Sequence, residues 1–146
     1  MEIKILDVSA PEVLALFAEY DDFIIDFLGD DRVYYTRYSA DERIDCCWVA
    51  YDGGEPVGCV AYRVKSVGMG ELKRVYVKEK YRGRGVSKQL VAVVEEYARK
   101  RGDHTFFLST RVTLEPAVTL YRRAGFVPTF CEGFYVEMEK KLTEKP

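Results

Sequence analysis

The chain is poor in metal-binding residues and in long apolar runs. His104 is its one histidine, and its four cysteines, at positions 46, 47, 59 and 131, form no CxxC pair. Zinc coordination needs a pairing of ligands that this spacing does not offer, so no metal is expected. Cys46, Cys47 and Cys59 lie in apolar runs, where a free cysteine behaves as a small buried hydrophobe. We therefore expect reduced thiols, as is usual in the cytoplasm.

A membrane-spanning segment and a secretion signal are also missing from the sequence. No apolar stretch approaches the roughly 20 residues that a membrane-spanning helix needs. Residues 1–17 alternate charged and apolar side chains and lack the apolar core of a signal peptide. These absences favour a soluble, cytoplasmic protein without a membrane partner.

Neither sign of charge dominates the chain as a whole. The net charge of −2 gives no general reason to expect a nucleic-acid partner. The charges are nevertheless unevenly distributed. Residues 1–45 hold 12 acidic and 4 basic side chains, whereas residues 46–146 hold 12 acidic and 18 basic ones. This polarity indicates either two differently charged surfaces or an acidic region that attracts a cationic ligand.

What the sequence does contain is the periodicity of one α/β domain. Its 146 residues suit a single domain, which we place at residues 1–146. The pattern predicts an α/β (α+β) fold, with helices flanking a mixed, mostly antiparallel sheet. Helices are expected from about 11 to 29, from 86 to 102 and from 113 to 125, and strands at 2–6, 46–51, 56–64, 71–77, 104–110 and 134–142.

Local signals refine three of these boundaries. Ser9 and Glu12 have the spacing of a capping box, which predicts that Ser9 caps the first helix while Glu12 reaches back. Thr113 is predicted to cap the third helix, which Gly125 ends. Residues 30–45 fit either a helix or a loop.

The stretch "KYRGRGVSKQL", residues 80–90, has the composition of an anion site. It follows a strand and opens a helix, whose unpaired N–H groups and dipole favour negative charge. Gly83 and Gly85 let the backbone approach a phosphate, and Arg82, Arg84 and Lys88 add positive charge. The stretch is not a P-loop, which needs GxxxxGK followed by Ser or Thr. It also lacks the third glycine of a dinucleotide fingerprint, since Lys88 stands there.

Two longer stretches resemble the GNAT superfamily of N-acetyltransferases. "ELKRVYVKEKYRGRGVSKQL" resembles the central motif of that family, and "FLSTRVTLEPAVTLYRRAGF" resembles its second motif. Lys80, Gly83 and Gly85 occupy the patterned positions of the family's loop, Q/R-x-x-G-x-G/A, with lysine a mild departure. The two motifs occur in the family's order and spacing, and the strand order fits from about residue 3 to 142.

The resemblance implies acetyl-CoA as a cosubstrate, with no metal and no bound prosthetic group. The pantetheine would lie along the backbone of Val75, Tyr76 and Val77. The pyrophosphate would lie on backbone amides of the loop, which are those of Arg82, Gly83, Arg84, Gly85, Val86 and Ser87. Leu114 stands where relatives often have Asn or Gln, so one cofactor contact of the family is not expected here.

The resemblance also implies direct transfer of the acetyl group to an amine. A backbone N–H near Val75 would stabilise the oxyanion, and Tyr121 would protonate the leaving thiolate. Glu71 matches an acid that takes the amine proton in many relatives. Each side chain has a simpler interpretation: Tyr121 packs in the core of its helix, and Glu71 pairs with a neighbouring cation of its strand, Lys73 or Arg74.

The acceptor groove of the family is built from the first helix and the segment after it. That segment contains Tyr34, Tyr35 and Tyr38 with Asp30, Asp31 and Asp41. Its negative charge would attract a cationic amine, although a solvated polar surface has the same composition.

The resulting hypothesis is an acetyl-CoA-dependent N-acyltransferase acting on a primary amine of a small molecule. The alternatives are acetylation of a protein or peptide amine, and a catalytically silent CoA-binding module. Nucleic-acid binding through residues 73–88 is disfavoured because the base-stacking pattern of the RNP motifs is absent. A homodimer is common in the family.

Overall fold

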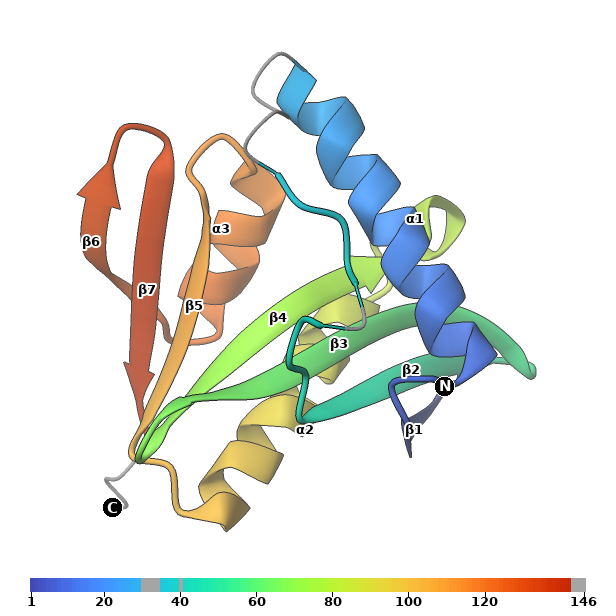
Figure 1. Ribbon diagram of the computed structural model, residues 1–146, viewed down its shortest axis with the longest axis horizontal. Helices are drawn as coiled ribbons and strands as arrows, with labels where there is room; N and C mark the ends of the chain where they lie inside the picture. The colour runs from blue at the N-terminus through green and yellow to red at the C-terminus, as the bar shows by residue number, and fades with distance from the viewer. Residues whose placement is uncertain (30–34, 40, 143–146) are drawn as a thin grey trace.

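The computed structural model describes residues 1–29, 35–39 and 41–142. Over these residues it forms one 7-stranded sheet with helices on both faces (Figure 1). The elements are β1 (Glu2–Leu6), α1 (Pro11–Leu28), β2 (Cys46–Asp52), β3 (Glu55–Ser66), β4 (Met69–Val77), α2 (Val86–Arg101), β5 (Thr105–Arg111), α3 (Glu115–Arg123), β6 (Val127–Glu132) and β7 (Tyr135–Lys141), with a short 3-10 helix at Glu79–Tyr81.

The sheet has the order β1-β2-β3-β4-β5-β7-β6. Neighbouring strands run antiparallel, except for β4 and β5, which are parallel. The parallel pair needs a crossover connection, and α2 supplies it. The predicted fold class, a mixed and mostly antiparallel sheet flanked by helices, is confirmed.

The parallel pair of strands is joined over only part of its length. Residues Met69–Glu71 of β4 pair with Thr105–Phe107 of β5, and Glu71 opposite Phe107 is the last pair. Beyond Glu71 the two strands diverge, as Figure 1 shows. The sheet therefore opens between β4 and β5 at the level of Glu71.

A β-bulge follows on the other side of β4. Ala61 of β3 faces Lys73, but Cys59 faces Tyr76, so Arg74 and Val75 together oppose a single residue of β3, Val60. Arg74 has φ 54°, and it is the one non-glycine residue with positive φ in the described part of the chain.

The period-2 alternation of β2 divides the core between the two faces of the sheet. Cys47 and Val49 face α1 and pack with Val13 and Phe17. Trp48 and Ala50 face the other way and belong to the cluster that holds residues of α2 and α3, Leu90 and Tyr121 among them. A fully buried aliphatic side chain such as Leu90 contributes about 1.5–3 kcal/mol. The two clusters thus pack the sheet against α1 on one face and against α2 and α3 on the other.

Most of the predicted elements lie where the pattern placed them, but both predicted caps are wrong. The residue that precedes α1 is Ala10, and Ser9 instead donates from its backbone N and its Oγ to Oδ1 of Asp7, at 2.8 and 2.6 Å. Asp7 outcompetes the helix because its carboxylate is two residues away and accepts both bonds. At α3, Leu114 and not Thr113 occupies the cap position, without a side-chain hydrogen bond.

One strand was not predicted at all. Residues Val127–Glu132 form β6, the edge strand beside β7, and all of its residues are exposed. A strand that is exposed on both faces leaves no alternation of apolar and polar residues to detect. The open question of residues 30–45 is answered in part: residues 35–39 and 41–45 form neither helix nor strand, and the others lie outside the described residues.

The predicted core thiols are found as unbridged cysteines. Cys47 and Cys59 are buried, Cys46 is half-buried and Cys131 is exposed, and all four are free. Among the helices of the described chain, none combines the length and apolar character that a membrane crossing requires. Within the same residues, no three His, Cys, Asp or Glu side chains come together as metal ligands would.

Candidate active site

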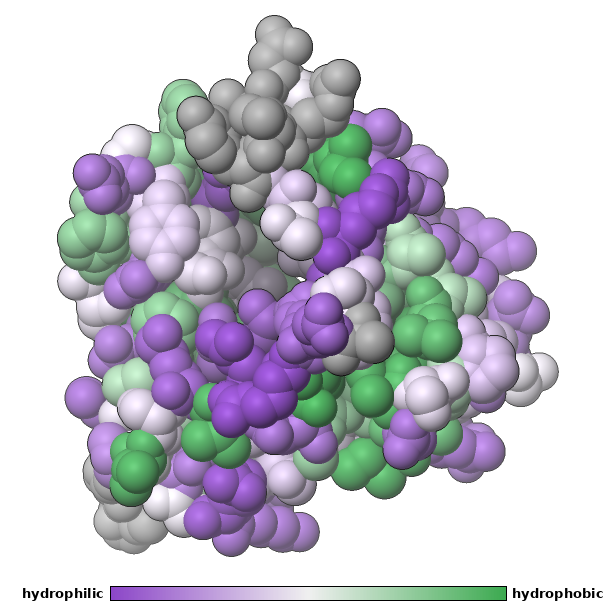
Figure 2. All heavy atoms as spheres, in the orientation of Figure 1, coloured by the Kyte–Doolittle hydropathy of each residue, from purple (hydrophilic) through white to green (hydrophobic). Residues whose placement is uncertain are grey.

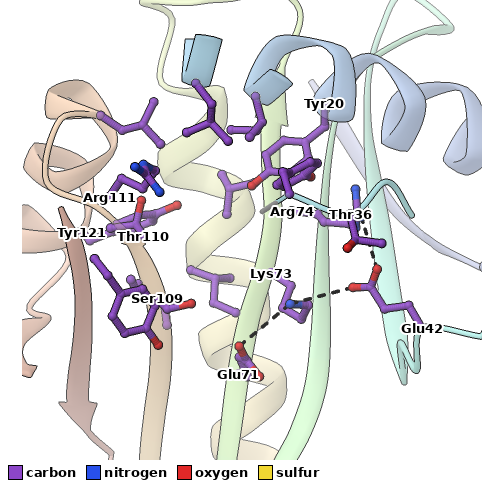
Figure 3. Close-up of a pocket in the computed structure, with 18 residues that line it drawn as sticks. Tyr20, Thr36, Glu42, Glu71, Lys73, Arg74, Ser109, Thr110, Arg111 and Tyr121 are labelled. Carbon is purple, nitrogen blue, oxygen red and sulfur yellow. Dashed lines mark hydrogen bonds and ion pairs between the residues drawn. The ribbon is translucent and has the colours of Figure 1, made fainter. Parts of the chain in front are cut away.

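The opening between β4 and β5 contains a cavity of about 440 Å³. Figure 3 shows it from the side: α1 lies above, β4 and β5 form the walls, and α3 lies at one end. Both predicted catalytic side chains, Glu71 and Tyr121, line this cavity. The two residues are 50 positions apart in sequence, Glu71 on β4 and Tyr121 on α3, and the opening between β4 and β5 brings them to one cavity. On the same face, hydrophilic residues gather across the middle of the molecule, over β3 and β4 (Figure 2).

Glu71 is buried at the point where β4 and β5 separate, with 5% of its surface exposed. Its Oε1 accepts two hydrogen bonds from Arg63 on β3, from Nε at 3.1 Å and from Nη2 at 2.7 Å. Oε2 has a longer contact, 3.9 Å, with Nζ of Lys73. Arg63 was not predicted as a partner of Glu71. It lies opposite Glu71 because of the register between β3 and β4, which the local sequence does not indicate. The predicted pairing with Lys73 is found, whereas Arg74 pairs elsewhere.

Tyr121 lies at the other side of the cavity, on α3. Figure 3 shows its side chain next to Thr110 and Arg111 at the end of β5. Its ring packs edge-on against Phe126, with ring centroids 6.1 Å apart. Burial in this apolar surrounding raises the pKa of the Tyr121 phenol, because a phenolate would lose its hydration there. The hydroxyl is therefore protonated at neutral pH.

Ion pairs continue from Glu71 on the side of the cavity away from Tyr121 (Figure 3). Nζ of Lys73 lies between two carboxylates, 3.9 Å from Glu71 and 3.8 Å from Glu42. Arg74 pairs with Glu42 through Nη2 at 3.2 Å and with Asp21 through Nη1 at 2.9 Å. Asp21 and Glu42, which belong to the acidic region 1–45, are thus each paired with a cation of β4.

The residues predicted for the acceptor groove are divided between the cavity and its surroundings. Tyr35 lines the cavity, and its hydroxyl donates to Oδ1 of Asp21 at 2.7 Å. Tyr38 packs edge-on against Phe17 of α1, behind the cavity wall. Asp41 is exposed. The remaining three, Asp30, Asp31 and Tyr34, lie outside the described residues.

One edge of β4 is open where the pantetheine is predicted to lie. From Val75 to Val77 the strand pairs with β3 on one side only, since β5 has already diverged. Val75 lines the cavity. The side chain of Tyr76 points to the face of α1 and donates to Glu19 at 3.3 Å. The backbone groups on the open edge have no strand partner among the described residues, and the carbonyl of Val77 is occupied by the side chain of Arg82. An extended ligand can therefore pair with the groups that precede that carbonyl.

The glycine-rich loop has a backbone that only glycine adopts easily. Gly83 has φ 79° and Gly85 has φ 80°, and Gly85 precedes α2 without any side-chain cap. A Cβ built on either glycine meets no atom within 4 Å, so the loop leaves open space above its backbone. The N–H groups of the first turn of α2 have no partner within the helix and face that space. The predicted phosphate cradle is consistent with this geometry.

Arg82 departs from its predicted role in part. Its backbone N–H, which the resemblance assigns to the pyrophosphate, donates to the carbonyl of Glu79 at 3.2 Å. Its side chain turns back toward β4: Nε donates to the carbonyl of Val77 at 2.8 Å, and the guanidinium lies 4.9 Å from the ring centroid of Phe23 on α1. Arg82 therefore connects the loop to β4 and α1.

Comparison with known proteins agrees with these features. The acetyltransferase (GNAT) family matches residues 13–126. N-acetyltransferase 8 of Mus musculus is 34% identical over 115 residues, which are 75% of this chain and 51% of that protein. The chain thus spans about half the length of the curated relatives it matches.

Solved structures with the same fold cover nearly the whole chain. A Klebsiella pneumoniae protein designated an acyl-CoA N-acyltransferase has a TM-score of 0.78 and 28% identity, with 97% of each chain covered. The PaiA N-acetyltransferase of Thermoplasma acidophilum, solved in complex with coenzyme A, has a TM-score of 0.73 and 19% identity, with 97% of this chain and 99% of that chain covered. On these matches, and with its two motifs and its glycine-rich loop, the chain belongs to the acetyltransferase (GNAT) family.

Proposed function

We propose that this protein transfers the acetyl group of acetyl-CoA directly to a primary amine of a small molecule, in the cavity between β4 and β5. The observation that carries the proposal is the meeting of Glu71, Tyr121 and the open edge of β4 around one cavity. These three features are the acid–base groups and the cosubstrate surface that an acyl transfer needs.

Glu71 begins the reaction by taking a proton from the acceptor. An alkyl amine has a pKa of about 10 and arrives mostly protonated, so it has to lose a proton before it attacks. Oε1 of Glu71 is occupied by Arg63, while Oε2 has only the 3.9 Å contact with Lys73. Oε2 is thus the oxygen that receives the proton.

The neutral amine then attacks the thioester carbon, and the C–S bond breaks. Negative charge develops on the carbonyl oxygen, where a backbone N–H near Val75 on the open edge stabilises it. The electron pair of the C–S bond leaves with the sulfur, and Tyr121 donates its proton to the thiolate. The phenol of Tyr121 is protonated at neutral pH, so it carries a proton to donate. The nitrogen of the former amine releases its second proton as the amide forms, and that proton restores the phenol of Tyr121.

The walls of the cavity favour a small acceptor over a protein chain. Its volume of about 440 Å³ falls in the usual range of small-molecule sites, roughly 300–1,000 Å³. Residues of α1, β4, β5 and α3 line it on several sides, and the rest of it is open to solvent. A peptide would need a groove that is open along its length.

The experiment is a screen of free-thiol release from acetyl-CoA against amines, polyamines, amino acids and peptides. We expect turnover with at least one small amine and much weaker turnover with peptides. Preferred turnover of peptides would overturn the small-molecule acceptor. Binding of acetyl-CoA without turnover on any amine would indicate a silent CoA-binding module.

A further inference from the structure

Arg74 combines two unfavourable local features in one buried residue. Its backbone is in the left-handed region, with φ 54°, which costs an L side chain free energy. Its Nε is the one buried side-chain nitrogen or oxygen without a hydrogen-bond partner in the described part of the chain. An unpaired buried donor also costs free energy. Such features persist where the surrounding structure requires them, so the contacts of Arg74 need an explanation.

The guanidinium of Arg74 lies in a cage of two carboxylates and three aromatic rings. Nη1 donates to Asp21 at 2.9 Å and Nη2 to Glu42 at 3.2 Å. The carbon atom at the centre of the guanidinium lies 5.0 Å from the ring centroid of Phe17, 5.4 Å from that of Tyr20 and 5.1 Å from that of Tyr38. Contacts of this kind are strongest when both partners are removed from water.

Asp21 extends this cage to the segment after α1. Its Oδ1 accepts the hydroxyl of Tyr35 at 2.7 Å, and its Oδ2 accepts the backbone N–H of Tyr38 at 2.9 Å. The segment from Tyr35 to Glu42 has no helix or strand of its own where it is described, so it holds its place through such bonds. Its contacts with Arg74 and Asp21 connect it to β4 and to α1.

The same cage borders the cavity. Tyr20, Tyr35 and Glu42 each contact Arg74 or Asp21, and each lines the cavity. Figure 3 shows Tyr20 and Glu42 across the cavity from Tyr121. Val75, whose backbone is predicted to meet the thioester, follows Arg74 in the bulge. A shift of Arg74 would therefore move the acceptor wall relative to the cosubstrate edge.

We propose that Arg74 is a positioning residue: its side chain fixes the segment Tyr35–Glu42 against the bulge of β4 and thereby shapes the acceptor end of the cavity. The effect that Arg74 has on turnover of the amine rests on the proposed acetyl transfer. Its effect on the order of the segment does not depend on that proposal.

Replacing Arg74 with glycine tests the role of its side chain separately from that of its backbone conformation. Glycine adopts φ 54° without cost, so Arg74→Gly is compatible with the bulge and removes the whole side chain, the guanidinium included. We expect the KM for the amine to rise and kcat to fall, together by roughly 10–100-fold in kcat/KM, because small misplacements of reacting groups are costly. The affinity for acetyl-CoA should change little, since the loop Arg82–Ser87 is untouched.

Hydrogen exchange provides a readout that needs no enzymatic activity. The Tyr38 amide donates to Asp21, and in Arg74→Gly it should exchange faster while amides of α2 and β5 keep their wild-type rates. Arg37→Ala is the matched control, because it removes an exposed arginine–aspartate pair, Arg37 with Asp22, between the same segment and the same helix. That control should leave both the KM for the amine and the Tyr38 exchange rate unchanged.

A second variant keeps the proposal testable if Arg74→Gly does not fold. Arg74→Lys keeps a positive charge beside Asp21 but lacks the planar fork that reaches Glu42 and stacks on the rings, so the same changes should appear at smaller size. Unchanged acceptor KM and unchanged Tyr38 exchange in a folded variant would overturn the proposal. If the wild type acetylates no amine, the acetyl-transfer proposal fails, and the exchange rates still decide the role of Arg74.

Discussion

At the scale of single residues, the two proposed proton-transfer groups have opposite surroundings. Tyr121 is in an apolar surrounding that keeps its proton on the phenol, whereas Glu71 is beside two cations, Arg63 and Lys73. The cavity thus has a protonated phenol on one side and, on the other, a carboxyl group that Arg63 holds in place.

Removal of the Tyr121 hydroxyl tests the proton donor. Tyr121→Phe keeps the ring that packs on Phe126, so folding and acetyl-CoA affinity should change little. We expect kcat to fall roughly 10²-fold, the lower end for a general acid, because a thiolate is a fair leaving group without a proton. An intact kcat together with a lowered Tm would instead show that Tyr121 is a core residue, and the donor would have to be another group.

The base is tested by Glu71→Gln. We expect kcat/KM to fall most at neutral pH and to recover in part as the pH rises, because a rising pH deprotonates the free amine without help. Arg63→Gln is the control for the structural role of the pair, since it removes the partner of Oε1 and leaves the carboxylate. A loss that is independent of pH and equal in both variants would contradict a role as base.

At the scale of elements, the short 3-10 helix, the glycine loop and α2 form one unit. Gly83 and Gly85 each adopt a left-handed backbone conformation, and the first turn of α2 follows directly after Gly85. The unit begins where the open edge of β4 ends. One continuous piece of chain thus offers a strand edge for the pantetheine and a helix N-terminus for the phosphates.

Gly83→Val tests this unit. Valine in the left-handed region costs about 1–2 kcal/mol, and its side chain would fill the space that the phosphates need, so acetyl-CoA binding should fall below detection. Gly102→Val is the matched control: Gly102 also has positive φ and open space around it, but it lies at the other end of α2. Calorimetry should show normal affinity for the control only. Normal affinity in a folded Gly83→Val protein would defeat the assignment of the loop.

The elements also show what the sequence could predict. Helices and strands with one buried face, such as α2 and β2, have a clear period, and the glycine loop follows from local chemistry. The opening beyond Glu71, the bulge at Arg74 and the place of Arg63 depend on strand register, which is a contact between distant segments. The Asp21–Arg74 pair joins residues 53 positions apart, so no local pattern could indicate it.

At the scale of the whole molecule, burial raises the pKa of several phenols and thiols. It raises the pKa of Tyr20 to about 12 and that of Cys47 to about 12, because the charged forms would lose their hydration in the core. The ordinary values are 10.0 and 9.0. Between the ordinary and the raised values, the folded chain binds more protons than the unfolded chain.

It follows that the protein should lose stability in alkali. The contribution of these groups to the free energy of unfolding should be complete below about pH 9. It should be lost as the pH rises toward about 12, because unfolding then releases protons. Urea denaturation at a series of pH values measures this slope. Tyr20→Phe should make the decline shallower. A free energy of unfolding that stays constant over this range would contradict the burial of these groups.

The most direct test of the account follows an isotopically labelled acetyl group from acetyl-CoA, with mass spectrometry of both the small-molecule fraction and the protein. With an amine chosen from the screen, direct transfer predicts label in the acetylated amine, none on the protein, and none in either fraction with Gly83→Val. Label that first accumulates on the protein and then moves to the amine, or coenzyme A binding with no labelled amine, would contradict direct acetyl transfer in the cavity between β4 and β5.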